Sequence, residues 1–392
     1  MSRFRPTDEK QLADIVAAAI AGEEPLEVIA GGSKQALGRP LQLPHALDVG
    51  AFGGIRQYEP EELVLTAGAA TPLAGIEQAL ATKHQMLAFE PADWRPLLGS
   101  AAAGQTLGGV IACNLSGPRR IRQGAARDHF LGVAAVSGRG EAFKAGGRVV
   151  KNVTGYDLCK LLAGSYGTLA VMTEITVKVL PAPEATRTVV LSGLDEARAV
   201  AAMTHALNAP HELSGAAHLP KRGGRPCTLL RLEGPVPSVE ARAAALRDEL
   251  RPFGPADILG DDESVKLWLA VRDATPLVAG EGAVWRVSLA PTAAPAFLAA
   301  LRDALAIDYL LDWGGGLVWL AIGGADDGGA GAIRAALGGN GHATLVRAPP
   351  AVRAAVPVFE PLAPAVAALT ARVKDSFDPK RILNRGRMYP DL

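Results

Sequence analysis

The chain has 392 residues, of which 49% are hydrophobic, so it is long enough for two or three folded domains and is not a disordered chain. Its 40 lysines and arginines balance 40 aspartates and glutamates. No excess charge is left for binding nucleic acid, and that class of partner is excluded.

The cysteine pattern argues against metal and disulfide chemistry within the chain. Cys113, Cys159 and Cys227 form no C-x-x-C pair, so an iron–sulfur cluster, a zinc site or a disulfide framework is not expected. This usage fits a reducing, cytoplasmic setting. The N-terminus lacks an apolar signal core, and no uncharged apolar run approaches the roughly 20 residues that span a bilayer. Any membrane association is therefore expected to be peripheral.

The first predicted elements are a helix and a strand that lead into a glycine pair. Helical spacing of apolar residues predicts a helix that begins at Thr7 or Asp8 and ends near residue 22, and residues 26–30 are predicted to form a strand. The strand is followed by a run suited to holding a diphosphate through backbone N–H groups, a hydroxyl and an amine: Gly31, Gly32, Ser33 and Lys34. A plain turn is the alternative, because neither G-x-G-x-x-G nor G-x-x-x-x-G-K-[ST] is present.

A second glycine pair follows in the same half. Strands are predicted at 64–67 and 86–89, with a helix over 72–83 between them. Residues 105–109, QTLGG, are predicted to be a loop that leads to three small or polar residues, Asn114, Ser116 and Gly117. Arg120 and Arg122 in the basic run that follows are interpreted as a solvated face, and residues 130–144 as a hairpin that turns at 138–140.

Residues 151–181 combine a helix cap, a short helix, a glycine turn and a strand. Thr154 and Asp157 have the spacing of a capping box, and Gly164 is placed to end the helix. The turn GSYGT lets backbone approach a ligand closely, and from Thr173 onward polar and apolar residues alternate as in a half-buried strand. An ordinary connection between a helix and a strand is the alternative.

The second half contains two similar series of elements. Residues 185–250 are predicted to form β, α, β, β, α, and residues 284–346 to form β, α, β, β, α, β. We interpret them as two ferredoxin-like repeats. A last helix over 364–376 is predicted to place Val366, Leu369, Val373 and Phe377 on one face before a tail that begins FDPKRILNRG.

The order of these segments resembles the FAD-binding domain of the vanillyl-alcohol-oxidase or PCMH type. The resemblance rests on GGSK after a strand, then QTLGGVIACNLSG, RDHFLGVAAVSGRGE and KNVTGYDLCKLLAGSYGTLAVMTEITVKVLP. Within that group the chain is most similar to the family of the smaller, FAD-binding subunits of bacterial glycolate oxidase. Such a subunit belongs to a complex with a catalytic flavoprotein and an iron–sulfur protein.

The resemblance implies roles for the residues already singled out. Residues 31–34 are expected to hold the FAD diphosphate, Thr106, Leu107, Gly108 and Gly109 to close over the cofactor, and residues 114, 116 and 117 to line the route to the flavin. Backbone contacts are also expected from Gly167, Thr168, Leu169 and Val171, with Asn384 of the tail at the flavin edge. The FAD is expected to be noncovalent, because neither GGSK nor LSGPRR carries a histidine or a cysteine.

Catalytic relatives implied by this resemblance carry closely spaced histidines and an acidic-histidine motif that this chain lacks. It has no H-x-H and no E-H-G, and its glycine turn has Tyr166 where the family usually has glutamate. His342 and Arg347 are five residues apart on a predicted strand, so they are expected on opposite faces in a structural role. No catalytic residue is assigned.

The sequence thus predicts an α+β fold with an FAD-binding PCMH-type domain over residues 1–182, an α+β cap over 183–360 and a tail over 361–392 that returns to the first domain. The expected function is that of a noncovalent FAD-binding subunit of a glycolate oxidase complex, which supports oxidation of glycolate to glyoxylate by assembly or electron transfer. Its partners would be the catalytic flavoprotein, the iron–sulfur protein and a small 2-hydroxy acid, with any membrane contact made through partners. An independently catalytic glycolate or D-lactate dehydrogenase and a flavin-free interaction subunit are the alternatives.

Overall fold

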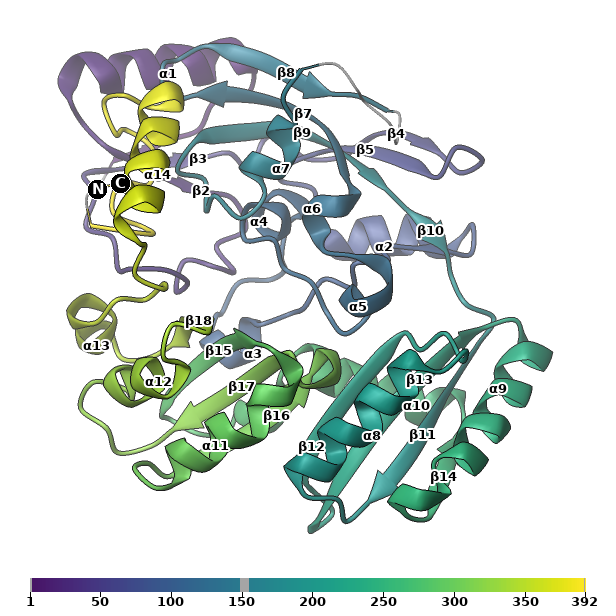
Figure 1. The fold of residues 1–392 in the computed structure, drawn as a ribbon. Coiled ribbons are helices and arrows are strands. Elements are labelled where there is room, and N and C mark those ends of the chain that lie inside the picture. Colours follow the sequence, from purple (N-terminus) through teal and green to yellow (C-terminus); the bar gives the residue numbers. More distant parts are fainter. Residues whose placement is uncertain (1, 149–154, 391) are drawn as a thin grey trace.

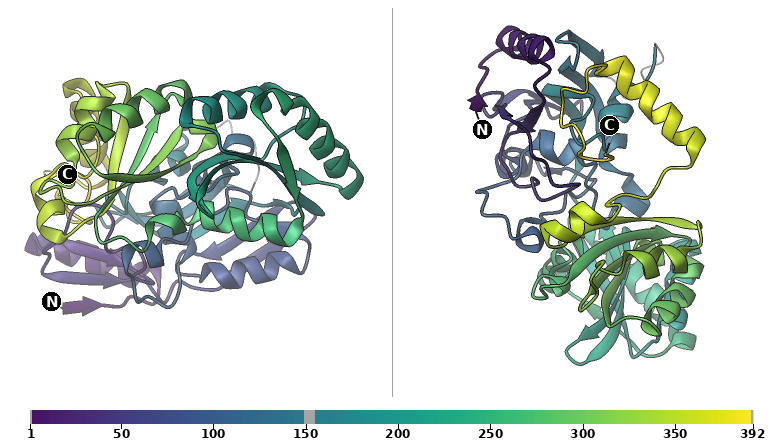
Figure 2. Two further views of the ribbon diagram at one scale, coloured as in Figure 1. Left: turned by 90° about the horizontal axis from the view of Figure 1, so that it is seen from below. Right: turned by 90° about the vertical axis from the view of Figure 1, so that its left-hand side faces the viewer.

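The computed structural model describes residues 2–148, 155–390 and 392, which form two lobes (Figure 1). The N-terminal lobe contains three sheets built from β1 to β10, and the C-terminal lobe contains one eight-stranded sheet built from β11 to β18. Both ends of the chain lie on the N-terminal lobe (Figures 1 and 2). Among the described residues, no helix is both long and apolar enough to cross a bilayer.

The N-terminal lobe combines a parallel sheet of order β1-β3-β2, an antiparallel sheet of order β4-β5-β9-β7-β8 and a β6-β10 pair. Its strands are β1 Ser2–Phe4, β2 Leu26–Ile29, β3 His45–Asp48, β4 Ile55–Glu59, β5 Val64–Gly68, β6 Gln85–Met86, β7 Phe130–Ser137, β8 Ala142–Gly146, β9 Ala170–Lys178 and β10 Leu180–Pro181. Its helices are α1 Glu9–Gly22, α2 Leu73–Ala81, α3 Arg95–Leu98, α4 Leu107–Ala112, α5 Arg120–Gln123, α6 Ala126–His129 and α7 Leu158–Leu162.

One predicted helix start is confirmed by its capping geometry, and a second differs from the prediction. The Asp8 side chain accepts a hydrogen bond from the backbone of Gln11 and begins α1, as expected. Asp157 is itself the N-cap of α7, through the N–H of Lys160, and not the third helical residue of a capping box; the predicted N-cap Thr154 lies outside the described residues. Gly164 follows α7 with φ +81°, the left-handed conformation that the sequence predicted.

The prediction of a loop at residues 105–109 is wrong. Thr106 Oγ1 accepts a hydrogen bond from Gly109 N at 3.3 Å, and this contact begins α4. The N–H groups of Leu107 and Gly108 donate to the carbonyls of Thr71 and Ala69. Gly108 is required for close packing, because a Cβ there would lie 2.8 Å from the Ala69 carbonyl oxygen.

The C-terminal lobe has an antiparallel sheet of order β14-β11-β13-β12-β16-β17-β15-β18. Each half of the sheet is built from a β-α-β-β-α-β series, which the sequence predicted except for β14 and the additional helix α10. The strands are β11 Ala185–Ser192, β12 Gly215–Arg222, β13 Arg225–Gly234, β14 Ala256–Leu259, β15 Ala283–Leu289, β16 Ile307–Asp312, β17 Leu317–Ile322 and β18 Gly341–Arg347. The helices are α8 Glu196–Asn208, α9 Val236–Glu249, α10 Asp261–Arg272, α11 Ala294–Arg302 and α12 Ala330–Leu337.

The two faces of this sheet have different neighbours. Side chains such as Leu230 and Leu320 form one core with α8, α9, α11 and α12. Side chains of the opposite face, such as Leu229 and Trp319, join the core of the N-terminal lobe, and Trp319 packs edge-on against Trp94 at 5.1 Å. The sheet therefore covers one side of the N-terminal lobe (Figure 2).

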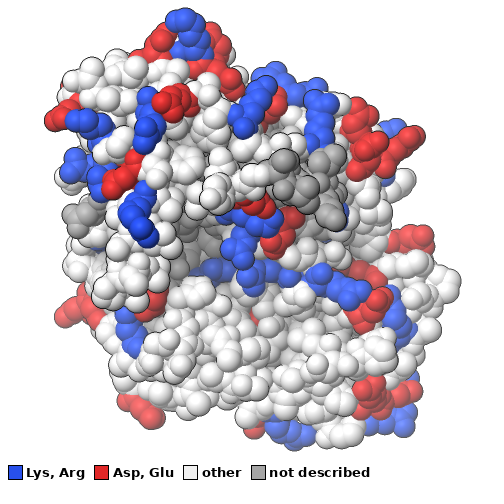
Figure 3. Space-filling model, turned by 45° about the horizontal axis from the view of Figure 1, so that its top comes forward, with Lys and Arg blue, Asp and Glu red and all other residues white. Residues whose placement is uncertain are grey.

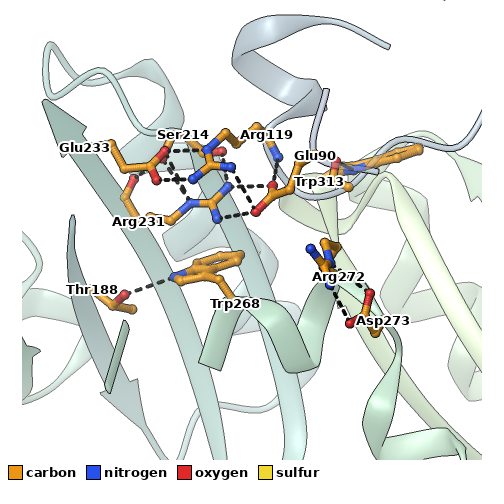
Figure 4. Close-up of polar contacts among 11 residues, drawn as sticks. Glu90, Arg119, Thr188, Ser214, Arg231, Glu233, Trp268, Arg272, Asp273 and Trp313 are labelled. Carbon is orange, nitrogen blue, oxygen red and sulfur yellow. Dashed lines mark hydrogen bonds and ion pairs between the residues drawn. The ribbon is translucent and has the colours of Figure 1, made fainter. Parts of the chain in front are cut away.

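A buried ionic network joins the lobes (Figure 4). Glu90 and Arg119 come from the N-terminal lobe, and Arg231 and Glu233 come from β13. The Arg231 guanidinium pairs with Glu90 at 2.9 Å, and Arg119 pairs with Glu233 at 2.6 Å. Burial opposes ionisation of Glu233, but Arg231 and Arg119 lower its pKa to about 2. All four charges are thus compensated within the network.

The chain returns to the N-terminal lobe through α13 Pro350–Ala355, α14 Pro364–Phe377 and the tail. The apolar face predicted for α14 is wrong in part, because Val366 and Leu369 are 49% and 52% exposed. The helix is held instead by buried Lys374, whose amine bonds the carbonyls of Thr168 and Leu383. Backbone hydrogen bonds from the tail to Leu26 then seat it beside β2.

Candidate functional site

The N-terminal lobe contains an open cavity between its parallel and antiparallel sheets, with a volume of about 130 Å³. Ten of the predicted site residues line the cavity: Gly31, Gly32, Ser33, Lys34, Thr106, Gly108, Gly109, Gly167, Val171 and Asn384. Segments far apart in the sequence therefore meet at one site.

The GGSK segment offers unclaimed hydrogen-bond donors to this cavity. Within the described part of the chain, no carbonyl or side chain accepts from the N–H groups of residues 31–34. Gly32 has φ +73°, a conformation that residues with a Cβ rarely adopt. Consecutive N–H groups without an acceptor, in a turn with a glycine at positive φ, are an arrangement that binds a phosphate oxygen.

Lys34 supplies the positive charge of the same wall. Its Nζ lies 2.9 Å from Gln105 Oε1 and 3.3 Å from Ser33 Oγ, and no carboxylate pairs with it among the residues described. Burial lowers the pKa of the amine. A bound diphosphate would provide the missing negative charge, so the residues present fit the diphosphate of a dinucleotide.

The second glycine segment, residues 106–109, contributes fewer groups to the cavity than predicted. Thr106, Gly108 and Gly109 line the cavity, but the N–H groups of Leu107 and Gly108 are bonded to backbone carbonyls. Leu107 is fully buried. Leu107 does not line the cavity, and its predicted contact with the cofactor stays a prediction.

The predicted route through Asn114, Ser116 and Gly117 is only partly present. Asn114 and Ser116 line a second, smaller cavity between the lobes. Gly117 lines neither cavity; its carbonyl accepts from Trp313 Nε1 at 3.1 Å. A Cβ at Gly117 would lie 2.5 Å from the Glu90 carbonyl oxygen and 3.0 Å from Cγ of Arg272 in the C-terminal lobe, so this glycine is required for packing within and between the lobes.

The glycine turn and the tail meet at the opposite wall. Asn384 accepts from Val28 N and donates to the Tyr166 carbonyl, both at 2.8 Å, and so joins β2 to the turn. Gly167 is required there, because its Cβ would lie 2.8 Å from Asn384 Nδ2. Thr168 and Leu169 do not line the cavity, and the Thr168 carbonyl accepts from Lys374.

Twelve lining residues were not predicted, and three of these have titratable side chains: Cys113, Tyr166 and Arg387. Burial raises the pKa of the Cys113 thiol to about 11. Arg387 is paired with Glu27 at 2.9 Å. Tyr166 has φ +55° and packs edge-on against Phe359 at 5.0 Å, and burial raises its pKa. One feature of the sequence could have indicated a role for Tyr166: a bulky side chain stands within a glycine turn.

The described residues contain no assembled metal centre. No group of three or more histidine, cysteine, aspartate or glutamate side chains among them could hold a metal ion. Arg347 has a structural role, since its guanidinium bonds the carbonyls of Leu97, Leu277 and Val278. Its predicted neighbour His342 does not line either cavity.

Comparison with known proteins places this architecture in a family. Residues 3–146 match the family described as FAD binding domain. The "Glycolate oxidase subunit GlcE" of Escherichia coli (strain K12) is 36% identical over 394 residues, which cover 99% of this chain and 100% of that protein. The "Glycolate oxidase subunit GlcD" of Bacillus subtilis (strain 168) is 42% identical over 83 residues, 21% of this chain and 18% of that protein.

A solved structure supports the fold alone. The 4-ethylphenol oxidase from Gulosibacter chungangensis superposes with a TM-score of 0.74 at 15% identity, covering 99% of this chain and 89% of that one. The fold is therefore that of an FAD-binding oxidoreductase, and the cofactor is FAD. Because its identity to GlcE extends over the whole of both proteins, the chain belongs to the glycolate oxidase subunit GlcE family.

Proposed function

We propose that this chain is a noncovalent FAD-binding subunit of a glycolate oxidase complex and supports the oxidation of glycolate to glyoxylate by assembling the complex or passing electrons onward. The observation that carries the proposal is the row of unclaimed N–H groups at residues 31–34 beside the unpaired Lys34. FAD, when bound, supplies the hydride and electron chemistry. The chain's residues bind and orient it.

The chemistry of Cys113 supports noncovalent binding. Cys113 lines the open cavity of the N-terminal lobe, which we call the flavin cavity. Its thiol, with a pKa of about 11, stays protonated at neutral pH. A protonated thiol is a poor nucleophile. Precipitating the protein with acid should therefore release all the flavin into the supernatant.

The proposal places catalysis of glycolate oxidation on a partner. A 2-hydroxy-acid dehydrogenase needs a base near the substrate hydroxyl. The described residues show no histidine or carboxylate lining the flavin cavity. An independently catalytic dehydrogenase and a flavin-free interaction subunit are the alternatives; the second is disfavoured by the unclaimed donors of residues 31–34.

The remaining assignments complete the proposal. We propose an FAD-binding domain over residues 1–182, a cap of two ferredoxin-like repeats over 183–360 and a returning tail over 361–392; the strand order of the eight-stranded sheet supports the repeats. The proposed partners are a catalytic flavoprotein and an iron–sulfur protein. Contact with a membrane would be made through these partners.

Reconstitution tests the proposed function. The purified chain, the catalytic flavoprotein and the iron–sulfur protein are assayed alone, in pairs and together for glycolate-dependent dye reduction. The proposal predicts that the full set is active and that omitting this chain abolishes the activity. Full activity of the two partners without this chain would overturn it. Dye reduction by this chain alone would support the independently catalytic alternative.

A further inference from the structure

Two arginines from different lobes lie over the same tryptophan ring. Arg120 of α5 has its guanidinium carbon 4.3 Å from the centroid of Trp313, and Arg286 of β15 has its own 4.9 Å from that centroid. Trp313 is fixed by donating its indole N–H to the Gly117 carbonyl of the N-terminal lobe. The two cations are therefore held at the boundary between the lobes.

Neither cation is compensated. Among the residues that the structure describes, neither guanidinium has a hydrogen bond or an ion pair. The nearby Asp312 carboxyl accepts from the backbone N–H of Trp313, and burial raises its pKa to about 7, so it is only partly ionised at neutral pH. Arg286 is partly buried, whereas Arg120 is exposed. A partly buried cation without a partner costs free energy, which an anion bound at Arg286 would recover.

Arg286 also lines the small cavity between the lobes, which measures about 40 Å³. About 10–15 Å³ holds one water molecule, so this space suits a group of roughly three heavy atoms, such as a carboxylate. Trp94 lines the same cavity, and its buried indole N–H has no partner in the described part of the chain. An unpaired cation and an unpaired donor thus border one cavity.

This small cavity adjoins the flavin cavity. Cys113 and Tyr166 line both, and Thr344, the cross-strand neighbour of Arg286, lines the small cavity. Figure 3 shows a band of lysine and arginine side chains along the boundary between the lobes. An anion that reaches this boundary would meet positive charge before it meets the flavin cavity.

We propose that Arg286, with Arg120 behind it on Trp313, binds the carboxylate of a small 2-hydroxy or 2-oxo acid beside the flavin cavity. This inference rests on the proposed function for its choice of acid. Arg286 provides the guanidinium fork that matches a carboxylate. Arg120 does not line the cavity and contributes its charge. The acid would then bind beside the flavin cavity, although the described residues lining that cavity include no base to take the proton of its hydroxyl group.

The test is titration of the flavin-loaded chain with oxalate, followed by calorimetry and by the difference spectrum of the flavin. We expect saturable binding that Arg286→Met weakens at least tenfold and Arg120→Met weakens several-fold. The matched control is Arg122→Met, because Arg122 lies on the same helix and is exposed like Arg120 but is paired with Glu212 at 2.7 Å; oxalate binding should be unchanged.

Thermal unfolding separates binding from folding. Without an anion, Arg286→Met should unfold at the wild-type temperature or above, because an uncompensated cation has been removed. Oxalate should raise the unfolding temperature of the wild type and not that of this variant. A merely structural arginine would instead lower the unfolding temperature without oxalate, and that result would overturn the proposal.

Further outcomes are equally decisive. The inference fails if the wild type does not bind oxalate, if Arg286→Met binds it with unchanged affinity, or if inorganic phosphate binds as tightly as oxalate. Calorimetry on the flavin-free chain distinguishes failure of the proposed anion site from failure of the proposed FAD-binding function. Oxalate binding that depends on Arg286 in a chain that takes up no FAD would support the anion site and refute the FAD-binding proposal.

Discussion

Arg119 and Arg120 are neighbours in the sequence, yet they belong to two different kinds of charge cluster between the lobes. Arg119 enters a network in which Glu90, Arg231 and Glu233 compensate one another, and this network holds the lobes together (Figure 4). Arg120 lies over Trp313 without a carboxylate. We infer that compensated charges here stabilise the fold, whereas uncompensated groups mark the places proposed to bind a ligand.

The largest expected effect comes from breaking the compensated cluster. Arg231→Met should lower the free energy of unfolding by about 3–5 kcal/mol, because Glu90 and Glu233 would stay buried with less positive charge. Urea denaturation measures the change. Arg225→Met, at an exposed position of the same strand, is the control and should have little effect. Equal stability of the two variants would contradict a role for the network in joining the lobes.

The next effect is a loss of stability in acid. The pKa of Glu233 is about 2 in the folded chain and about 4.5 in the unfolded chain, so its ionised form stabilises the fold above pH 4.5. This contribution is roughly 3 kcal/mol and is lost as the pH falls from 4.5 towards 2. Urea denaturation from pH 6 to pH 3 should show a steeper decline for the wild type than for Glu233→Gln. Parallel profiles would show that the carboxylate is not stabilised.

A smaller effect is expected on the uncompensated side, at the flavin cavity. Lys34→Met should weaken FAD about 10- to 100-fold, since a hydrogen bond between charged groups contributes about 1.5–3 kcal/mol. Fluorescence titration of the flavin-free chain with FAD measures the affinity. Lys10→Met, which removes an exposed lysine paired with Asp14, should bind FAD like the wild type. Unchanged affinity of Lys34→Met would place the diphosphate elsewhere.

The smallest energy is expected for backbone strain in the GGSK turn. Gly32→Val places a β-branched residue at φ +73°, at a cost of about 1–3 kcal/mol, and should deplete the flavin that copurifies. Gly54→Val is a matched control, because Gly54 also has positive φ, at +94°, and has open space around it. If both variants keep full flavin, the turn does not hold the cofactor.

Gly109→Val separates crowding from backbone strain. Gly109 is not in the positive-φ region, and a Cβ there would lie 3.3 Å from Thr106 Oγ1 and 3.8 Å from Lys34 Nζ. The branched side chain should therefore displace Lys34 and reduce flavin content with little change in stability. Flavin content and the thermal unfolding temperature are measured together.

Most of the fold could be predicted from the sequence because its elements have clear periodicity. The repeated series in the C-terminal lobe follows from alternating strands and helical spacing. β14 was missed because it is a short edge strand, and α10 because its apolar residues are not confined to one face: Val265 and Leu269 are 48% and 42% exposed. The helix α4 was missed because Gly108 and Gly109 are poor helix formers.

The candidate site was predictable only where one segment carries the signal. The GGSK turn and Gly167 could be placed from local pattern, and both line the cavity. The different environments of Arg119 and Arg120 could not be predicted from local pattern, because their partners Glu233 and Trp313 lie more than a hundred residues away in the sequence. Such pairings are set by how the lobes pack and not by local spacing.

The most direct test of the account is the visible spectrum of the isolated chain under anaerobic conditions. The chain should purify with oxidised flavin, and its absorbance should persist when glycolate is added, because the described residues that line the flavin cavity include no catalytic base. Addition of the partner proteins should then allow glycolate to support dye reduction. Rapid bleaching of the flavin by glycolate with every partner absent would contradict the account and identify this chain as the catalytic dehydrogenase.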